Sequence, residues 1–232
     1  MNRSLRAECN GEYWLLSLLP PTPLIVDVGF NEGRFSRETL RQRPNARIIG
    51  FEPAKSMQRK FRLNFAQESR VELLCYAVSN RRGEMEFFDS SDGCSSLVSG
   101  QRLGADRYRV ETIRLDDFAD ERGYSKIEML KIDAEGNDLS ALEGAERLLD
   151  RQAVDMFSFE YNAPWIDSRR FLRDARDFLA SKRYSMFRLF NGFLAPFRYS
   201  PHAERHDLGC IYVGVSRSRL GQGDFPIREF PE

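Results

Sequence analysis

Three acidic residues stand at the ends of short apolar runs, where their carboxylates could bind a ligand or move a proton. Asp27 opens a glycine-containing turn, Glu52 follows a second apolar run, and Asp133 closes a third. In an open α/β sheet, ligands bind at the carboxyl ends of the strands. The spacing therefore predicts that the three carboxylates meet at one site.

The turn after the first run discriminates between nucleotide ligands. Gly29 and Gly33 let the backbone approach a ligand where a Cβ would collide. Glu52, about 20 residues on, can accept hydrogen bonds from both hydroxyls of a ribose. A dinucleotide fingerprint, however, requires glycine where this sequence has Asn31 and Arg34. The pattern indicates a nucleoside ligand but disfavours NAD.

Negative charge around the turn favours a cationic ligand. Asp27 and Glu32 would repel a pyrophosphate, whereas they suit the ammonium and sulfonium groups of S-adenosylmethionine. The sequence also lacks the G-K-[ST] signature of a phosphate-binding loop. The remaining interpretation is an ordinary strand-to-helix turn that binds nothing.

Composition narrows the class of protein. The chain has 232 residues, enough for one full-sized domain, and 35 basic residues balance 35 acidic ones. A zero net charge argues against a nucleic-acid partner. The four cysteines form no C-x-x-C pair, which argues against structural zinc and fits a cytoplasmic protein. The apolar stretch at 13–19 is too short for a membrane span.

Apolar periodicity predicts strands alternating with helices. The predicted strands are 24–28, 47–51, 71–78, 127–133, 154–160, 184–190 and 208–215. The predicted helices are 33–43, 55–68, 138–150 and 167–182. An insertion at about 80–118 would add strands at 84–88 and 108–115, joined by a long loop at 89–107 that could form a lid or substrate collar.

This alternation predicts an α/β fold with an open, mostly parallel twisted sheet and helices on both faces. Two late strands without an intervening helix indicate an antiparallel last strand at the sheet edge, and the β insertion follows strand three. We expect a helical lead-in over residues 1–23, one domain over 24–220, and an irregular tail over 221–232.

Several motifs in order resemble the FkbM family of methyltransferases. They are Asp27–Gly33, Phe51–Pro53, Ser95–Leu97, Ile113–Phe118, Leu130–Gly136 and Leu142–Ala145. The resemblance implies a class I, Rossmann-like methyltransferase fold, S-adenosylmethionine as cofactor, and O-methylation of a hydroxyl on a sugar, glycolipid or secondary metabolite. The sequence departs from the family pattern at Phe30 and Ala134, and neither change removes a polar group.

The resemblance also implies roles for individual residues. The implied cofactor contacts are Asp27, Gly29, Asn31 and Gly33 around the methionine moiety, Glu52 with Pro53 at the ribose, Tyr76 and Ala77 at the adenine, and Asp133. Ser95 and Ser96 either help to close the site or form a hydrogen-bonded turn.

Methyl transfer to a hydroxyl needs alignment of the acceptor and benefits from a base. The candidate catalytic residues are Asp133, Glu135 and His206, and Glu160 is a further candidate base. Alternatively, Asp133 or Glu135 caps the next helix. No metal ligands are assigned, because Pro201 disfavours a helical pairing of His202 with His206. The need for a divalent cation stays open.

The sequence therefore predicts an S-adenosylmethionine-dependent O-methyltransferase whose partner is a small-molecule or glycan hydroxyl acceptor. Two alternatives remain: a non-catalytic module that binds the cofactor and acts through partners, and a methyltransferase of a different acceptor class. The acceptor itself and the oligomeric state are not predicted.

Overall fold

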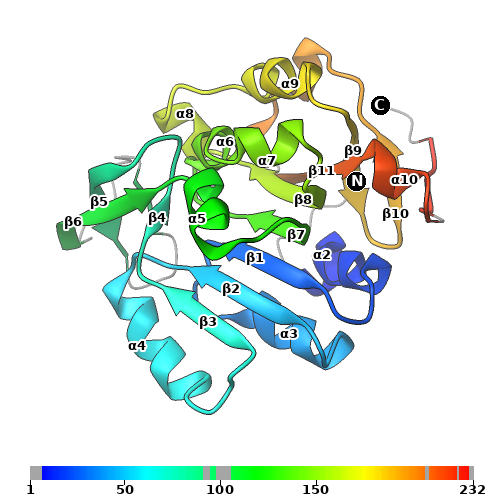
Figure 1. The fold of residues 1–232 in the computed structure, drawn as a ribbon. Helices are drawn as coiled ribbons and strands as arrows, with labels where there is room; N and C mark the ends of the chain where they lie inside the picture. Colours follow the sequence, from blue (N-terminus) through cyan, green and yellow to red (C-terminus); the bar gives the residue numbers. More distant parts are fainter. Residues whose placement is uncertain (1–6, 91–94, 98–105, 207–208, 224, 230–232) are drawn as a thin grey trace.

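The computed structural model describes residues 7–90, 95–97, 106–206, 209–223 and 225–229. The strands of the main sheet are β1 (Leu24–Val28), β2 (Arg47–Phe51), β3 (Val71–Leu74), β7 (Ile127–Ile132), β8 (Val154–Tyr161), β9 (Tyr184–Phe190), β10 (Phe193–Pro196) and β11 (Cys210–Ser216). They form an eight-stranded sheet in the order β10-β9-β11-β8-β7-β1-β2-β3 (Figure 1).

The direction of the strands confirms the predicted fold class. Strands β3, β2, β1, β7 and β8 pair in parallel. The last strand, β11, is antiparallel to both neighbours, but it lies inside the sheet between β8 and β9 and not at the edge as expected. The edge is β10, a strand that the sequence analysis missed, joined to β9 through Asn191 and Gly192. The Asn-Gly pair is a strong hairpin signal.

Helices cover both faces of the sheet. On one side lie α2 (Glu12–Leu15), η1 (Leu16–Leu18), α3 (Arg34–Gln42) and α4 (Lys55–Asn64), and on the other α5 (Leu115–Arg122), α6 (Asp138–Glu143), α7 (Glu146–Asp150), α8 (Pro164–Asp167) and α9 (Leu172–Ala180). The short elements α1 (Ala7–Asn10), η2 (Pro201–Ala203) and α10 (Arg217–Leu220) complete the fold. Within the described residues, no helix is long and apolar enough to cross a membrane.

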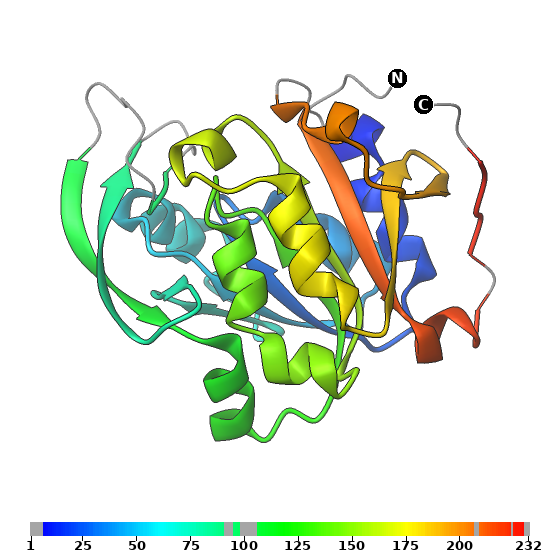
Figure 2. The same ribbon diagram turned by 90° about the horizontal axis from the view of Figure 1, so that it is seen from above.

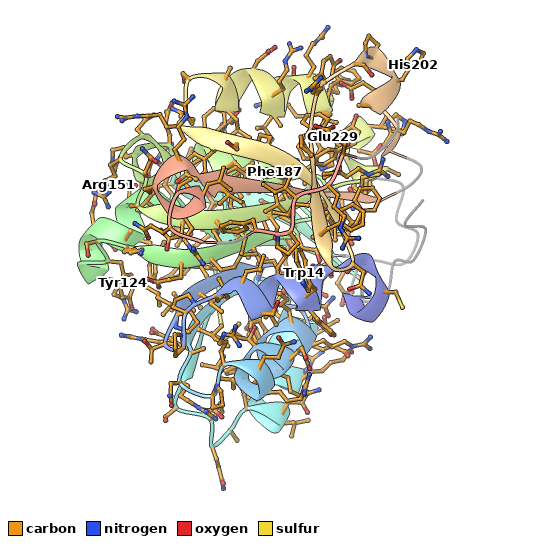
Figure 3. All side chains as sticks on the ribbon, turned by 90° about the vertical axis from the view of Figure 1, so that its right-hand side faces the viewer. Trp14, Tyr124, Arg151, Phe187, His202 and Glu229 are labelled. Carbon is orange, nitrogen blue, oxygen red and sulfur yellow. The ribbon has the colours of Figure 1, made fainter. Side chains whose placement is uncertain are left out.

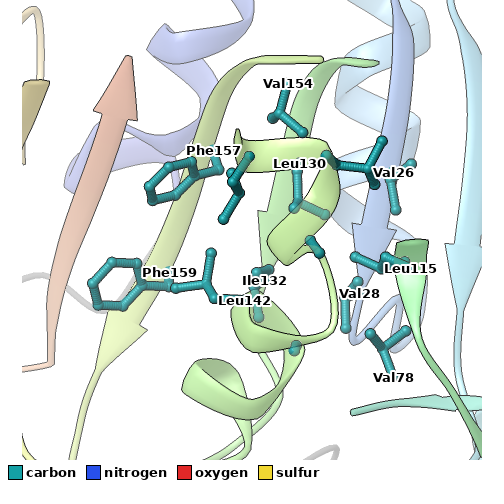
Figure 4. Packing of buried hydrophobic residues seen from close by; sticks show 14 of the residues in the cluster. Val26, Val28, Val78, Leu115, Leu130, Ile132, Leu142, Val154, Phe157 and Phe159 are labelled. Atoms are coloured by element: carbon teal, nitrogen blue, oxygen red, sulfur yellow. The ribbon is translucent and has the colours of Figure 1, made fainter. Parts of the chain in front are cut away.

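Each face has its own hydrophobic cluster. The first, shown in part in Figure 4, joins β-strand residues such as Leu130 and Phe157 to the helices from α5 to α9. The second packs the N-terminal helical segment and α3 on the opposite face, where Trp14 and Phe187 both contribute (Figure 3). The parallel strands are buried from both sides, as a doubly covered sheet requires.

The predicted β insertion forms a separate three-stranded sheet. Its strands are β4 (Ala77–Val78), β5 (Gly83–Asp89) and β6 (Asp106–Ile113), in the order β4-β6-β5. It lies at the end of the molecule opposite the β9–β10 hairpin (Figure 2). The single strand predicted at 71–78 is therefore wrong, because the chain leaves the main sheet after β3 and pairs with β6 as β4. Of the predicted loop at 89–107, residues 91–94 and 98–105 lie outside the described residues.

The insertion is fixed to the start of α4 by Asp89. Its carboxylate accepts hydrogen bonds from the Ser56 hydroxyl at 2.6 Å and from the Tyr108 hydroxyl at 2.6 Å. The Tyr108 oxygen in turn accepts the backbone N–H of Lys55 at 2.9 Å. These contacts satisfy N–H groups that the first turn of a helix leaves unpaired.

The helix predicted at 138–150 is broken at Gly144. A Cβ at Gly144 would lie 2.2 Å from the carbonyl oxygen of Ser79, so only glycine allows this approach to the insertion. Asp116, on the unpredicted helix α5, bridges the break: it accepts the backbone N–H groups of Arg147 at 3.1 Å and Leu148 at 3.0 Å. The helix predicted at 167–182 likewise becomes α8 and α9.

Replacing Asp116 by alanine should lower the free energy of unfolding by about 2–4 kcal/mol, because two backbone donors and the Arg114 guanidinium lose a buried acceptor. Asp117→Ala is the matched control, since its contact with Arg147 is exposed and should contribute at most about 1 kcal/mol. Urea denaturation of both variants measures the difference. Equal losses would show that the Asp116 network does not stabilise the fold.

Candidate active site

A cavity opens where β1, β2 and β7 end and where the insertion meets the main sheet. Its lining residues are Val28, Gly29, Asn31, Phe51, Glu52, Pro53, Met57, Tyr76, Ala77, Val78, Phe87, Ser95, Ser96, Leu97, Asp133, Ala134, Glu135 and Asn137. One end is bounded by polar groups from the strand ends, and the other by apolar side chains of α4 and the insertion.

Most residues singled out from the sequence line this cavity. They are Gly29, Asn31, Glu52, Pro53, Tyr76, Ala77, Asp133 and Glu135, together with Ser95 and Ser96. Asp27, Gly33, Glu160 and His206 are not among the lining residues. Gly33 has φ +74° and supplies the left-handed residue that starts α3, so it shapes the turn.

Gly29 brings the first turn against the end of β7. Its φ is +79°, and a Cβ built on it would lie 1.9 Å from the carbonyl oxygen of Asp133. The backbone N–H of Asp133 also donates to the carbonyl of Val28 at 3.0 Å. Any side chain at Gly29 would separate the two strand ends and widen the cavity between them.

Glu52 presents a buried carboxylate at the end of β2. One oxygen accepts the backbone N–H of Asn31 at 2.7 Å and the other that of Ala54 at 2.8 Å. Burial raises the pKa of Glu52 to about 7, although these two hydrogen bonds favour the charged form. A carboxylate in this position has acceptor sites left for two ligand hydroxyls.

Lys131 links the acids of β1 and β7. Its ammonium lies 3.6 Å from the Asp27 carboxylate and 3.3 Å from the Asp133 carboxylate. Burial disfavours the charge, but these two carboxylates hold the pKa of Lys131 above its ordinary value. Asp27 also accepts the Ser36 hydroxyl at 2.9 Å and is buried beneath the cavity. Asp27 therefore supports Asp133 through Lys131 and does not itself reach the cavity.

The turn after β7 is held from both sides. Glu135 has φ +50°, and its carbonyl accepts the Ser96 hydroxyl of the insertion at 2.6 Å. Asp138 caps the turn by accepting the N–H groups of Ala134 at 3.2 Å and Gly136 at 3.1 Å. Burial, with the nearby Asp133 charge, raises the pKa of Asp138 to about 7. The N-cap position of α6 is Asn137, so neither Asp133 nor Glu135 occupies it.

Glu160 extends the group of acids along the sheet. It accepts the side-chain amide of Asn162 at 3.3 Å, and its own carbonyl accepts the indole N–H of Trp165 at 2.8 Å. Burial, with the neighbouring Asp133 and Asp138 charges, raises the pKa of Glu160 to about 8. Trp165 is fully buried, which agrees with a packing role.

The structure does not bring His206 to the cavity. Its ring lies edge-on to that of Tyr161, 6.1 Å between centroids, and Tyr161 belongs to the cluster on the sheet face opposite Lys131. His202 is exposed at the surface (Figure 3). Over the described parts of the chain, no group of three or more His, Cys, Asp or Glu side chains could hold a metal ion.

Apolar lining residues were largely missed from the sequence, because Met57 and Phe87 carry only the signal of core positions. Asn137 was missed too; its amide donates to the Val78 carbonyl at 2.7 Å and joins the β7 turn to the insertion. Phe30, the departure from the family pattern, points away into a cluster with Phe61 and Phe65.

The buried acids predict an unusual pH dependence of stability. Glu52, Asp138 and Glu160 have raised pKa values of about 7, 7 and 8, so between pH 4.5 and 8 the folded protein holds protons that the unfolded chain has released. Stability should therefore fall as pH rises through this window. Glu52→Gln should remove about 3 kcal/mol of that fall.

Urea denaturation from pH 4.5 to 8.5 gives the slope for the wild type, for Glu52→Gln and for Glu111→Gln, a control at an exposed glutamate on β6. Only Glu52→Gln should reduce the dependence of stability on pH. A wild-type stability that rises steadily across this range would contradict the placement of protons on these carboxyls.

Curated relatives and solved structures agree with this geometry. The chain is 30% identical over 154 residues to 2-O-methyltransferase NoeI of Sinorhizobium fredii, covering 59% of this chain and 63% of the relative. It is 31% identical over 162 residues to methyltransferase sdnD of Sordaria araneosa, covering 55% and 62%. The chain thus spans about three fifths of the length of these relatives.

Among solved structures, the fold matches that of Methyltransferase FkbM from Methylobacillus flagellatus KT with a TM-score of 0.54 and 18% identity, over 83% of this chain and 44% of that one. The sequence matches the Methyltransferase FkbM domain over residues 27–186, which include the end of β1, the insertion and the Asp133 turn. The chain belongs to the FkbM family of S-adenosylmethionine-dependent methyltransferases.

Proposed function

We propose that this protein binds S-adenosylmethionine in the cavity and transfers its methyl group to a hydroxyl of a sugar, glycolipid or secondary-metabolite acceptor. The observation that carries the proposal is the single cavity joining the Glu52 carboxylate to Asp133. The 2-O-methyltransferase named among the relatives supports a hydroxyl as acceptor.

The lining chemistry fits this cofactor. Glu52 would accept the ribose hydroxyls, and the apolar walls supplied by Met57, Phe87 and Leu97 would cover the adenine beside Ala77. Near Gly29 the walls are backbone and the Asp133 carboxylate, which suits a positively charged amino acid moiety. Gly29 leaves the space that such a group requires.

The protein's part in the reaction is positioning and charge. S-adenosylmethionine supplies, when bound, an activated methyl group on a sulfonium. Asp133, held by Lys131, would orient the cofactor or the acceptor hydroxyl, and the Ser96–Glu135 contact would exclude water from the cavity. Alignment of this kind provides much of the rate enhancement of a two-substrate reaction.

Two alternatives are weaker. A nucleic-acid acceptor would require a basic surface, and the chain has no excess positive charge. A non-catalytic module would not need the Asp133–Lys131 pair, which turns a carboxylate toward the cavity. Methyl-transfer assays separate both alternatives from the proposal.

Titration calorimetry should show saturable binding of S-adenosylmethionine and none of NAD. Glu52→Ala should weaken S-adenosylmethionine binding about 100-fold, because the ribose hydroxyls lose a buried charged acceptor. Glu32→Ala is the control: Glu32 was expected to attract the cofactor's charge, but it is paired with Lys60 at 2.5 Å and does not line the cavity, so this variant should bind normally. Normal affinity of the Glu52 variant would remove this residue from the ribose site.

A screen with methyl-labelled S-adenosylmethionine and a panel of methyl glycosides and hydroxylated small molecules should yield a methyl ether. Asp133→Asn should lower turnover of the acceptor found by about 10-fold or more and should reduce cofactor affinity less than turnover, since the larger loss is in alignment. Mass spectrometry locates the new methyl group. Transfer to amines or to RNA alone would refute the hydroxyl acceptor.

A further inference from the structure

Glu160 lies beside Asp133 on the next strand of the sheet. The register pairs Ile132 of β7 with Phe159 of β8, so Asp133 and Glu160 are adjacent one residue further on. Neighbouring strands are about 4.8 Å apart, and successive side chains alternate between faces. Ile132 and Phe159 both pack on the face of α6 and α9, so Asp133 and Glu160 both project to the other face.

The cavity ends beside this position. It extends from Glu52 at the end of β2, past Gly29 on the β1 turn, to Asp133 at the end of β7, and Glu160 is not itself a lining residue. The next strand in the sheet is β8, which ends with Glu160 and Tyr161. With the ribose at Glu52, an acceptor bound beyond Asp133 would lie on the Glu160 side.

Asp133 and Glu160 differ in their charged partners. Asp133 contacts the buried ammonium of Lys131 at 3.3 Å. Burial raises the pKa of Glu160, and the neighbouring acids Asp133, Asp138 on α6, Glu135 on the turn and Glu12 on α2 raise it further. A carboxyl that an ammonium contacts and a carboxyl surrounded by further acids are suited to different parts in a proton transfer.

We infer that Glu160 is the base that takes the proton of the acceptor hydroxyl, and that binding of the positively charged cofactor first removes the proton that Glu160 carries in the free protein. The inference rests on the proposed function and names a catalytic group within it. Its basis is the adjacency of Glu160 to Asp133 at the ends of neighbouring strands, among a group of acids in which Lys131 contacts Asp27 and Asp133.

The proton balance closes over one cycle. In the free protein, burial and the neighbouring acids raise the pKa of Glu160 to about 8, so it is mostly protonated at pH 7. A sulfonium nearby favours the carboxylate, and the proton leaves to solvent. As the acceptor oxygen bonds to the methyl carbon, the bond between that carbon and sulfur breaks and its electron pair stays on sulfur. The hydroxyl proton passes to Glu160. The thioether product carries no charge at sulfur, so it no longer disfavours the protonated state of Glu160.

His206 is the competing base and is poorly placed. Its ring packs edge-on against Tyr161. Tyr161 is the residue after Glu160 and therefore projects to the opposite face of the sheet. The Tyr161 hydroxyl is committed to Glu204, which also accepts the backbone N–H of Leu172 at 3.0 Å. This arrangement fixes the loop before β11 and leaves no path to the cavity through Tyr161.

The test measures protons and does not require the acceptor. Calorimetric titrations at pH 7 in phosphate and in Tris, buffers with different heats of ionisation, give the number of protons released on binding. S-adenosylmethionine should release about half a proton or more beyond S-adenosylhomocysteine, which lacks the sulfonium charge. Glu160→Gln should abolish this difference, whereas Glu111→Gln, a control at an exposed acid on β6, should keep it. Protons exchanged by the ligands themselves are common to all variants.

The outcomes separate the two proposals. Absence of S-adenosylmethionine binding would refute the proposed function. Binding with equal proton release by the wild type and Glu160→Gln would overturn this inference alone. On the acceptor that the screen identifies, Glu160→Gln should lose about 100-fold or more in turnover, and His206→Ala should not. Normal turnover of Glu160→Gln with lost proton release would overturn the base role.

Discussion

The contact on which the site depends is the buried ammonium of Lys131 between Asp27 and Asp133. The register of β1 and β7 sets Lys131 directly beside Asp27. Without the lysine, two acids on adjacent strands would repel each other in a buried place, where charges interact more strongly than in water. With it, the strand ends can approach until only glycine fits at position 29. The ion pairs of Lys131 and the close approach at Gly29 therefore act together to fix the position of Asp133.

The parallel sheet, the antiparallel last strand and the insertion were predictable because each has a local signal: apolar runs, turn residues and a change in periodicity. The errors arose where a distant contact decides the structure. The chain leaves β3 early because Ala77 finds a partner in Thr112 of the insertion. The helix after Asn137 breaks because Gly144 meets Ser79 and Asp116 caps the second half. These partners lie too far apart in the sequence for a local pattern to reveal their contacts.

The same distinction between local signals and distant contacts holds for the site. Glu52 and Asp133 could be found from spacing, because topology brings strand ends together, and Asn31 followed from the family resemblance. Met57 and Phe87 could not, since an apolar side chain facing a cavity has the same pattern as one facing the core. His206 was a candidate base because it is a titratable residue in a loop, but the sequence does not show which part of the structure a loop contacts. Its position follows from the packing of Tyr161 and Glu204.

The excess of acid around a single buried lysine has a consequence for the reaction cycle. A site with so many carboxylates stabilises a positively charged ligand and stabilises its neutral product less, because the difference between the two is one unit of charge at the sulfur. Release of product is then favoured by the same electrostatics that favour binding of the donor. Glu160 would reduce the repulsion among these acids when no ligand is bound, because its carboxyl can hold a proton whenever the ligand's charge is absent. Under the proposed function, donor binding, proton transfer and product release would thus be coupled through one charge.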